Sequence, residues 1–177
     1  MRITIGGPPG SGTTTIAMML AKRYGLEHIY AGKIFREMAI EKGLSLEEFG
    51  RLAENDESID RSVDKRLAEK AVEKTITEGR MAAFMVEEPD VKIWLDAPLK
   101  VRVSRISSRE GLEEEAVREM TIKRQESENQ RYRRYYGVDI YDLSHYDIVI
   151  NTEKWNEEGV YAIVDSAITH LVRATQE

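Results

Sequence analysis

Short apolar runs alternate along the chain with longer segments whose apolar residues recur at helical spacing. The apolar runs predict five strands, at residues 2–5, 28–30, 75–77, 91–95 and 147–150. The amphipathic segments predict helices at residues 13–25, 33–41, from 45 onward, and at 58–72, 99–109, 113–135 and 157–172. Strands that alternate with helices are typical of α/β proteins, so we expect a doubly wound three-layer sandwich around a five-stranded parallel sheet.

In a sheet of this kind, ligands bind beyond the carboxyl ends of the strands. Three of the predicted strands end in residues that could bind a ligand. A glycine-rich loop follows the first strand, Gly32 follows the second, and Glu78 and Arg80 follow the third. The sequence therefore predicts a single site at this edge, with Ala31 and Gly32 forming the turn that closes the second strand.

The loop after the first strand reads Gly7-Pro8-Pro9-Gly10-Ser11-Gly12-Thr13-Thr14-Thr15. It has the spacing of a phosphate-binding P-loop, G-x-x-x-x-G-K-[ST], except that Thr13 stands in the lysine position. Glycines let successive N–H groups point at a phosphate, and the next helix adds the partial positive charge of its N-terminus. The alternative is an ordinary glycine-rich turn. The strand before the loop and the helix after it favour a nucleoside triphosphate site.

Two acidic residues are candidates for holding a magnesium ion opposite the hydroxyl of Thr14. Glu78 ends the third predicted strand, where it could reach the ion through water. Asp96 ends the fourth strand in the same way, and Glu78 could instead be a surface carboxylate. We predict Thr14 and Glu78 as the metal-binding pair and keep Asp96 as the rival.

Arginines form two further candidate groups. Arg36 and Arg80 follow neighbouring strands, and together they could hold a second phosphate group. Arg124, Glu128 and Arg131 lie at i, i+4 and i+7 of one predicted helix, which places them on one face. This face suits a phosphoryl group in transfer between two nucleotides, and the alternative is a salt-bridge ladder within the helix.

Composition narrows the function classes. The chain has 177 residues, 41% of them hydrophobic, which suits one globular domain. Its net charge of −6 disfavours a nucleic-acid-binding module, although arginine is concentrated after residue 100. It has no cysteine, no apolar run long enough to span a membrane and no signal peptide. We expect a cytoplasmic protein that binds small anions, with no membrane and no obligate protein partner.

Several motifs, taken in order, resemble the archaeal-type cytidylate kinases. They are the loop from Ile5 to Thr15, Ala31-Gly32-x-Ile34-Phe35-Arg36, Glu78-Gly79-Arg80, Trp94-Leu95-Asp96-Ala97-Pro98 and Tyr146-Asp147-x-Val149-Ile150-Asn151-Thr152. The resemblance covers nearly the whole chain. It implies a P-loop kinase fold, with a small NMP-binding region at residues 33–73 and a short lid at about 105–140. It also implies transfer of a phosphoryl group from ATP to CMP or dCMP, with Mg²⁺.

The resemblance assigns roles to the candidate residues. The loop from Gly7 to Thr15 would hold the ATP phosphates, with threonine at position 13 as a trait of this branch. The acceptor nucleotide would contact Gly32, Arg36 and Arg80. The run Arg124, Glu128 and Arg131 is similar to the lid pattern of bacterial cytidylate kinases, Arg-x-x-x-acid-x-x-Arg, which touches both substrates. Bacterial members have aspartate-serine in place of Glu128-Asn129, and the stretch from Glu78 to Val91 is shorter than expected.

We therefore expect a cytidylate kinase in which Thr13, Arg124 and Arg131 serve catalysis and Glu128 contacts the acceptor. Two alternatives remain open at this point. The acceptor could be AMP or UMP, because base choice depends on few side chains. The protein could also be a nucleotide-binding regulator without turnover, which the missing P-loop lysine would suit.

Overall fold

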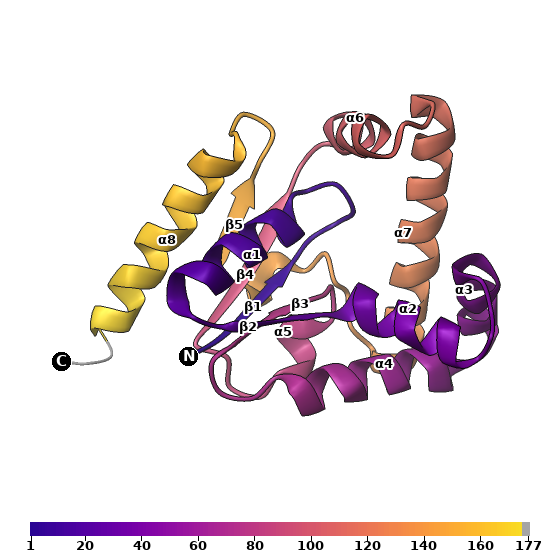
Figure 1. Ribbon diagram of the computed structural model, residues 1–177, viewed down its shortest axis with the longest axis horizontal. Helices are drawn as coiled ribbons and strands as arrows, with labels where there is room; N and C mark the ends of the chain where they lie inside the picture. Colours follow the sequence, from indigo (N-terminus) through magenta and orange to yellow (C-terminus); the bar gives the residue numbers. More distant parts are fainter. Residues whose placement is uncertain (175–177) are drawn as a thin grey trace.

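Five parallel strands form the centre of the molecule, as the sequence predicts (Figure 1). The computed structural model describes residues 1–174, so residues 175–177 of the expected domain lie outside the described residues. The strands are β1 (Arg2–Gly6), β2 (Glu27–Tyr30), β3 (Thr75–Glu78), β4 (Val91–Asp96) and β5 (Ile148–Asn151). They run in the order β2-β3-β1-β4-β5. The loop after β1 therefore leaves the middle of the sheet, where the strand order reverses.

Two helices cover one face of this sheet, α1 (Thr13–Tyr24) and α8 (Glu157–Ala174). Their apolar sides meet the strands in a single core, in which Ile3, Ile5, Leu20, Ile93 and Val164 are fully enclosed. These are the β-branched and leucine positions that predicted the strands and helices. The core fixes β1 and α1 relative to each other, and so fixes the loop between them.

A second apolar core lies under a group of three helices, α2 (Ala31–Glu41), α3 (Leu46–Asn55) and α4 (Glu57–Lys70). Phe49 and Leu67 are fully buried in it. The predicted start of α3 at Ser45 is confirmed by a capping box, in which Ser45 and Glu48 each bond the other's backbone N–H. These helices form a separate lobe at one end of the sheet (Figure 1).

The remaining long helices, α6 (Leu99–Glu110) and α7 (Glu114–Tyr136), follow β4 and carry half of the arginines. Their own apolar cluster is small and contains Val103, Ile106 and Val117. Helix α7 runs from α6 down to the lobe formed by α2, α3 and α4 (Figure 1). A 3₁₀ turn, Leu143–His145, leads from α7 back to β5.

Two details of the sequence reading are wrong. Gly32 is not in a turn, because α2 begins at Ala31 directly after β2. The Tyr30 ring explains the glycine: a Cβ at Gly32 would lie 2.6 Å from that ring. The short helix α5, Ala82–Met85, was also not predicted, since four residues give no readable periodicity. No helix among the described residues has the length and apolarity needed to cross a membrane.

Candidate active site

The loop from Gly7 to Thr15 curls between β1 and α1 as a phosphate-binding loop would. Gly10 has φ 84°, a left-handed conformation that favours glycine, and a Cβ there would lie 2.8 Å from the carbonyl oxygen of Arg102. A Cβ at Gly7 would lie 2.2 Å from the carbonyl oxygen of Leu95. Both glycines are thus required by close backbone approach. The loop ends at the N-terminus of α1, whose first-turn N–H groups are free to face an anion.

Glu78 is the hydrogen-bonding centre beside this loop. The hydroxyls of Thr14 and Thr13 donate to its Oε1 at 2.6 and 3.0 Å, and His28 Nε2 lies 2.9 Å from Oε2. The Glu78 side chain is 5% exposed. A buried carboxylate needs hydrogen-bond partners of this kind to offset its loss of water. The structure thus brings together Thr13, Thr14 and Glu78 and adds His28, which the sequence did not mark as a site residue.

Asp96, the rival for the metal, has different partners. Its Oδ1 accepts a hydrogen bond of 2.8 Å from the backbone N–H of Ala97, so it caps the start of the next segment. Its charge also favours the charged form of Arg102 on α6. Among the hydrogen bonds of the described residues, those of the two loop threonines go to Glu78 and not to Asp96.

Two arginines of α6 contact the outer side of the loop. Arg102 donates to the carbonyl oxygen of Pro9 at 3.1 Å, and Arg105 to that of Gly10 at 3.4 Å. Arg105 also holds Thr152, after β5, by its side chain and its backbone oxygen. The sequence reading noted these arginines only as part of a cationic segment. Their spacing of three residues, which puts both on one helix face, was the available signal.

A pocket of about 480 Å³ opens beside the loop, between α1, α6 and the start of α8. Its walls include loop residues Ser11, Gly12 and Thr15, together with Arg105, Thr152 and Trp155. Trp155 is half exposed and supplies an aromatic surface. The pocket therefore combines an aromatic ring, a guanidinium group and backbone from the phosphate loop.

On the opposite side of the site, buried charges join α7 to the segment that follows β3. Glu128 forms ion pairs with Arg80 and with Arg124, the latter at 2.8 Å. The Arg80 and Glu128 side chains are each 10% exposed, whereas Arg124 is 59% exposed. Burial and the neighbouring Arg124 lower the pKa of Arg80 to about 10, so its guanidinium stays charged at neutral pH. The predicted ladder within α7 exists for Arg124 and Glu128, and Arg80 extends it to the sheet.

Arg131 leaves this group and turns toward α4. Its Nε lies 3.2 Å from Asp60 Oδ2, and one turn along both helices the Tyr136 hydroxyl donates to Asp64 Oδ2 at 2.7 Å. Burial raises the pKa of Asp64 to about 6, and it raises the pKa of Asp60 as well. The sequence reading missed both aspartates, since they lie on an amphipathic helix with many other charges. They anchor α7 to the helical lobe.

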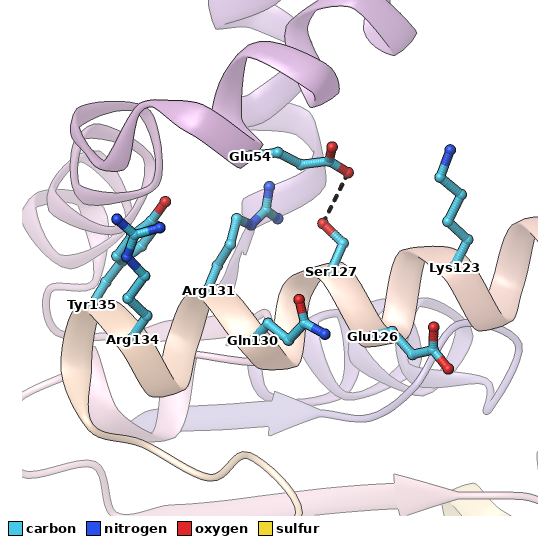
Figure 2. A pocket seen from close by; sticks show the side chains of 8 residues that line it. All are labelled: Glu54, Lys123, Glu126, Ser127, Gln130, Arg131, Arg134 and Tyr135. Carbon is cyan, nitrogen blue, oxygen red and sulfur yellow. Dashed lines mark hydrogen bonds between the residues drawn. The ribbon is translucent and has the colours of Figure 1, made fainter.

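A second pocket, of about 340 Å³, lies where α7 faces α3 (Figure 2). Figure 2 shows Lys123, Ser127 and Arg131 pointing from α7 toward Glu54 of α3, and Ser127 donates to Glu54 at 3.1 Å. The lining mixes both signs of charge with Gln130 and Tyr135. Arg131 therefore lines this pocket, which lies on a different face of α7 from the ion pair of Glu128 with Arg80.

Arg36 lies apart from the ion pairs that the other predicted site arginines form with Glu128 and Asp60. It is exposed on α2, and its guanidinium carbon stands 5.4 Å from the centroid of the Tyr30 ring. Tyr30 is paired in register with Glu78 across β2 and β3, so Arg36 lies over the same sheet edge. Its contact is with Tyr30, whereas Arg80 is engaged by Glu128.

Residues 2–154 match the model of the cytidylate kinase-like family. The chain belongs to this family. A cytidylate kinase of Pyrococcus horikoshii is 52% identical over 170 residues, covering 96% of this chain and 88% of the relative. One of Methanocaldococcus jannaschii is 49% identical over 176 residues, covering 97% and 99%. The resemblance seen in the motifs is therefore confirmed, and it extends over 88% and 99% of the length of these two relatives.

Solved structures share the fold of this cytidylate kinase-like chain. A shikimate kinase from Acinetobacter baumannii superposes with a TM-score of 0.61 at 15% identity, covering 95% of this chain and 92% of the other. An uncharacterized protein from Eubacterium ventriosum gives 0.72 at 20% identity, covering 94% and 97%. These likenesses show the fold alone, and they confirm the predicted three-layer α/β architecture.

Proposed function

We propose that this protein transfers the γ-phosphoryl group of ATP to CMP, giving ADP and CDP. The proposal rests on one observation: this member of the cytidylate kinase-like family has two groups of anion-binding residues on opposite sides of one site. The phosphate loop leaves the centre of the sheet, and Arg80, Arg124 and Arg131 lie at the same carboxyl edge and on α7. Phosphoryl transfer needs charge neutralisation and alignment more than covalent chemistry from the protein.

The donor side is the loop from Gly7 to Thr15. Its backbone N–H groups and the N-terminus of α1 would hold the ATP phosphates. Thr14 and Glu78, whose oxygens already lie 2.6 Å apart, would hold Mg²⁺, which when bound neutralises phosphate charge. The described residues include no group of three or more acids and histidines able to hold a metal alone. The phosphates of the nucleotide would complete the coordination, as is usual for magnesium.

The pocket beside the loop is our candidate for the donor nucleoside. Arg105 and Trp155 line it and offer the planar groups on which a base can stack. Arg105 is also anchored to Thr152 at 2.9 Å, which would keep the guanidinium in place. The donor base would then contact Arg105 and Trp155, while the donor phosphates contact the phosphate loop, which forms another wall of the same pocket.

The acceptor side is the proposed NMP-binding region at residues 33–73 and the proposed lid at about 105–140. Arg80 and Arg36 would bind the phosphate of CMP, with Gly32 allowing close approach at the start of α2. Glu128 would contact the acceptor, while Arg124 and Arg131 would stabilise the phosphoryl group in transfer. Because Glu128 already pairs with Arg80, the incoming phosphate would share or replace that carboxylate.

A coupled assay of ADP release across AMP, CMP, dCMP, UMP and GMP tests the proposal. We expect CMP to give the highest kcat/KM, with dCMP turned over as well. A higher value for AMP or UMP would make the protein a different nucleoside monophosphate kinase. Nucleotide binding without any turnover would make it a regulator. Placement in the cytoplasm, and action without nucleic acid or an obligate protein partner, are further predictions, to be tested by cell fractionation and with the purified chain.

A further inference from the structure

Arg102 is a charged residue buried against the outer side of the phosphate loop. The residue is 5% exposed, although it lies on a helix whose other arginines reach the surface or a pocket. Its Nε donates to the carbonyl oxygen of Ala97 at 2.8 Å, and its Nη1 donates to that of Pro9 at 3.1 Å. The same Nη1 lies 2.8 Å from Gln125 Oε1 on α7. One guanidinium therefore joins β4, the loop and α7.

The bond to Pro9 acts on a peptide group of the loop itself. The peptide that carries the Pro9 carbonyl also carries the Gly10 N–H, and in a trans peptide these two groups point in opposite directions. A cation at the carbonyl polarises the peptide and strengthens the N–H as a donor on the other side. The backbone of Arg102 also presses directly on Gly10, where any Cβ would lie 2.8 Å from the Arg102 carbonyl oxygen.

The charge of Arg102 matters because the loop lacks its usual cation. Thr13 stands in the lysine position, and its hydroxyl donates to Glu78. A charge that is buried acts through a low local dielectric and is felt more strongly than one in water. Burial lowers the pKa of Arg102 and Asp96 opposes that effect, and an arginine remains protonated at neutral pH.

We propose that Arg102 is a positioning residue for the donor nucleotide, which fixes the phosphate loop from its outer side and supplies there the positive charge that Thr13 does not carry. This rests on the proposed function, since it deepens the account of donor binding. Gln125 extends the arrangement to α7, on which it lies, and its Nε2 donates to the Tyr141 hydroxyl beyond the end of that helix at 3.0 Å. The loop and the helix that carries Arg124 thus share one anchoring group.

The test is calorimetric titration of ADP into the purified protein, with no acceptor present. Arg102→Gln keeps a donor but removes the charge, and we expect ADP binding at least about tenfold weaker, as for loss of a charged hydrogen bond. Arg102→Lys keeps the charge but lacks the forked geometry of arginine, and we expect it to recover about half of that loss on a logarithmic scale. The Kd for CMP, titrated in the same way, should change less than twofold in both. Arg23→Gln, at an exposed arginine on α1 that faces Asp165, is the matched control.

Three results would overturn the proposal: ADP binding by Arg102→Gln within twofold of wild type, Arg102→Lys no better than Arg102→Gln, or equal losses for ADP and CMP. If Arg102→Gln does not fold, Arg102→Lys decides alone, with ADP binding about threefold weaker at an unchanged CMP Kd. Equal losses or no loss would again overturn it. ADP binding is measured without turnover, so failure of the proposed CMP kinase activity would be seen separately.

Discussion

The two sides of the candidate active site are built in different ways. The phosphate loop would bind its ligand through backbone N–H groups and threonine hydroxyls, with glycines that allow its shape. Its residues follow one another along the chain. The side formed by α4, α7 and the end of β3 relies on buried ion pairs between distant residues, such as Arg80 with Glu128 and Arg131 with Asp60.

This difference predicts different behaviour toward a substrate. A loop of backbone donors is ready for phosphate, because its N–H groups need no rearrangement to accept an anion. The arginines opposite it already hold carboxylates, so a phosphate must take a partner away from a buried acid. Breaking a buried ion pair leaves an uncompensated charge, which is costly. We therefore expect the donor to bind a preformed site and the acceptor to bind by exchange of ionic partners.

The largest effect is expected at Arg124, the more exposed of the two arginines that pair with Glu128. Arg124→Ala should lower kcat by about 100-fold or more, because a charge that contacts the transferring phosphoryl group acts in the transition state. ATP and CMP KM values should change much less. Arg118→Ala, at an exposed position of the same helix, is the control in steady-state kinetics. A kcat near wild type in Arg124→Ala would remove this residue from the chemistry.

The metal pair is expected to show the next largest effect. Thr14→Val and Glu78→Gln should each lower activity about 10- to 100-fold, the range found when support of a metal site is removed. Both variants should also need more magnesium for half-maximal rate, which a titration of Mg²⁺ would measure. Asp96→Asn is the matched control, since Asp96 caps Ala97. If only Asp96→Asn shifts the magnesium dependence, the metal lies at the end of β4 instead.

The acceptor arginines come third. Arg36→Ala or Arg80→Ala should raise the CMP KM about tenfold or more, since a hydrogen bond to a charged group contributes about 1.5–3 kcal/mol. The ATP KM should change much less, because the loop binds the donor separately. Lysine should restore only part of the loss, as it lacks the forked geometry of arginine. Equal rises in both KM values would mean that these arginines support the sheet or the loop.

The smallest effect concerns the anchor between α4 and α7. The pKa of Asp64 is about 6 in the folded protein and near 3.8 without it, so the folded state binds more protons between these values. Its contribution to stability is therefore present at about pH 4 and is lost as pH rises through 6. Asp64→Asn should reduce the fall in the free energy of unfolding between pH 4 and 6 by about 1 kcal/mol or more, which corresponds to a few degrees in Tm. Thermal unfolding at pH 4 to 7 would measure it, and an unchanged slope would contradict it.

The same two sides differ in how far the sequence predicts them. The five strands, most of the helices, the phosphate loop and the family were predictable, because hydrophobic period and local motif determine them. The ion pair of Arg80 with Glu128 was not, since it depends on how α7 lies relative to the segment that follows β3. His28 was missed for the same reason: its partner Glu78 lies on the neighbouring strand, 50 residues away. Gly32 was wrongly predicted to lie in a turn. The structure explains this glycine by the Tyr30 ring, which fills the space that a Cβ would need.

The direct passage from β2 into α2 has a mechanical consequence. Most hinged lobes are joined to their base by loop residues that absorb rotation. Here Tyr30 ends the strand and Ala31 begins the helix, so a rotation of α2 must twist β2 itself. β2 is an edge strand of four residues, bonded on one side only to β3. A twist of β2 would therefore be resisted elastically by the strand. The His28–Glu78 bond would transmit it to the carboxylate beside the phosphate loop.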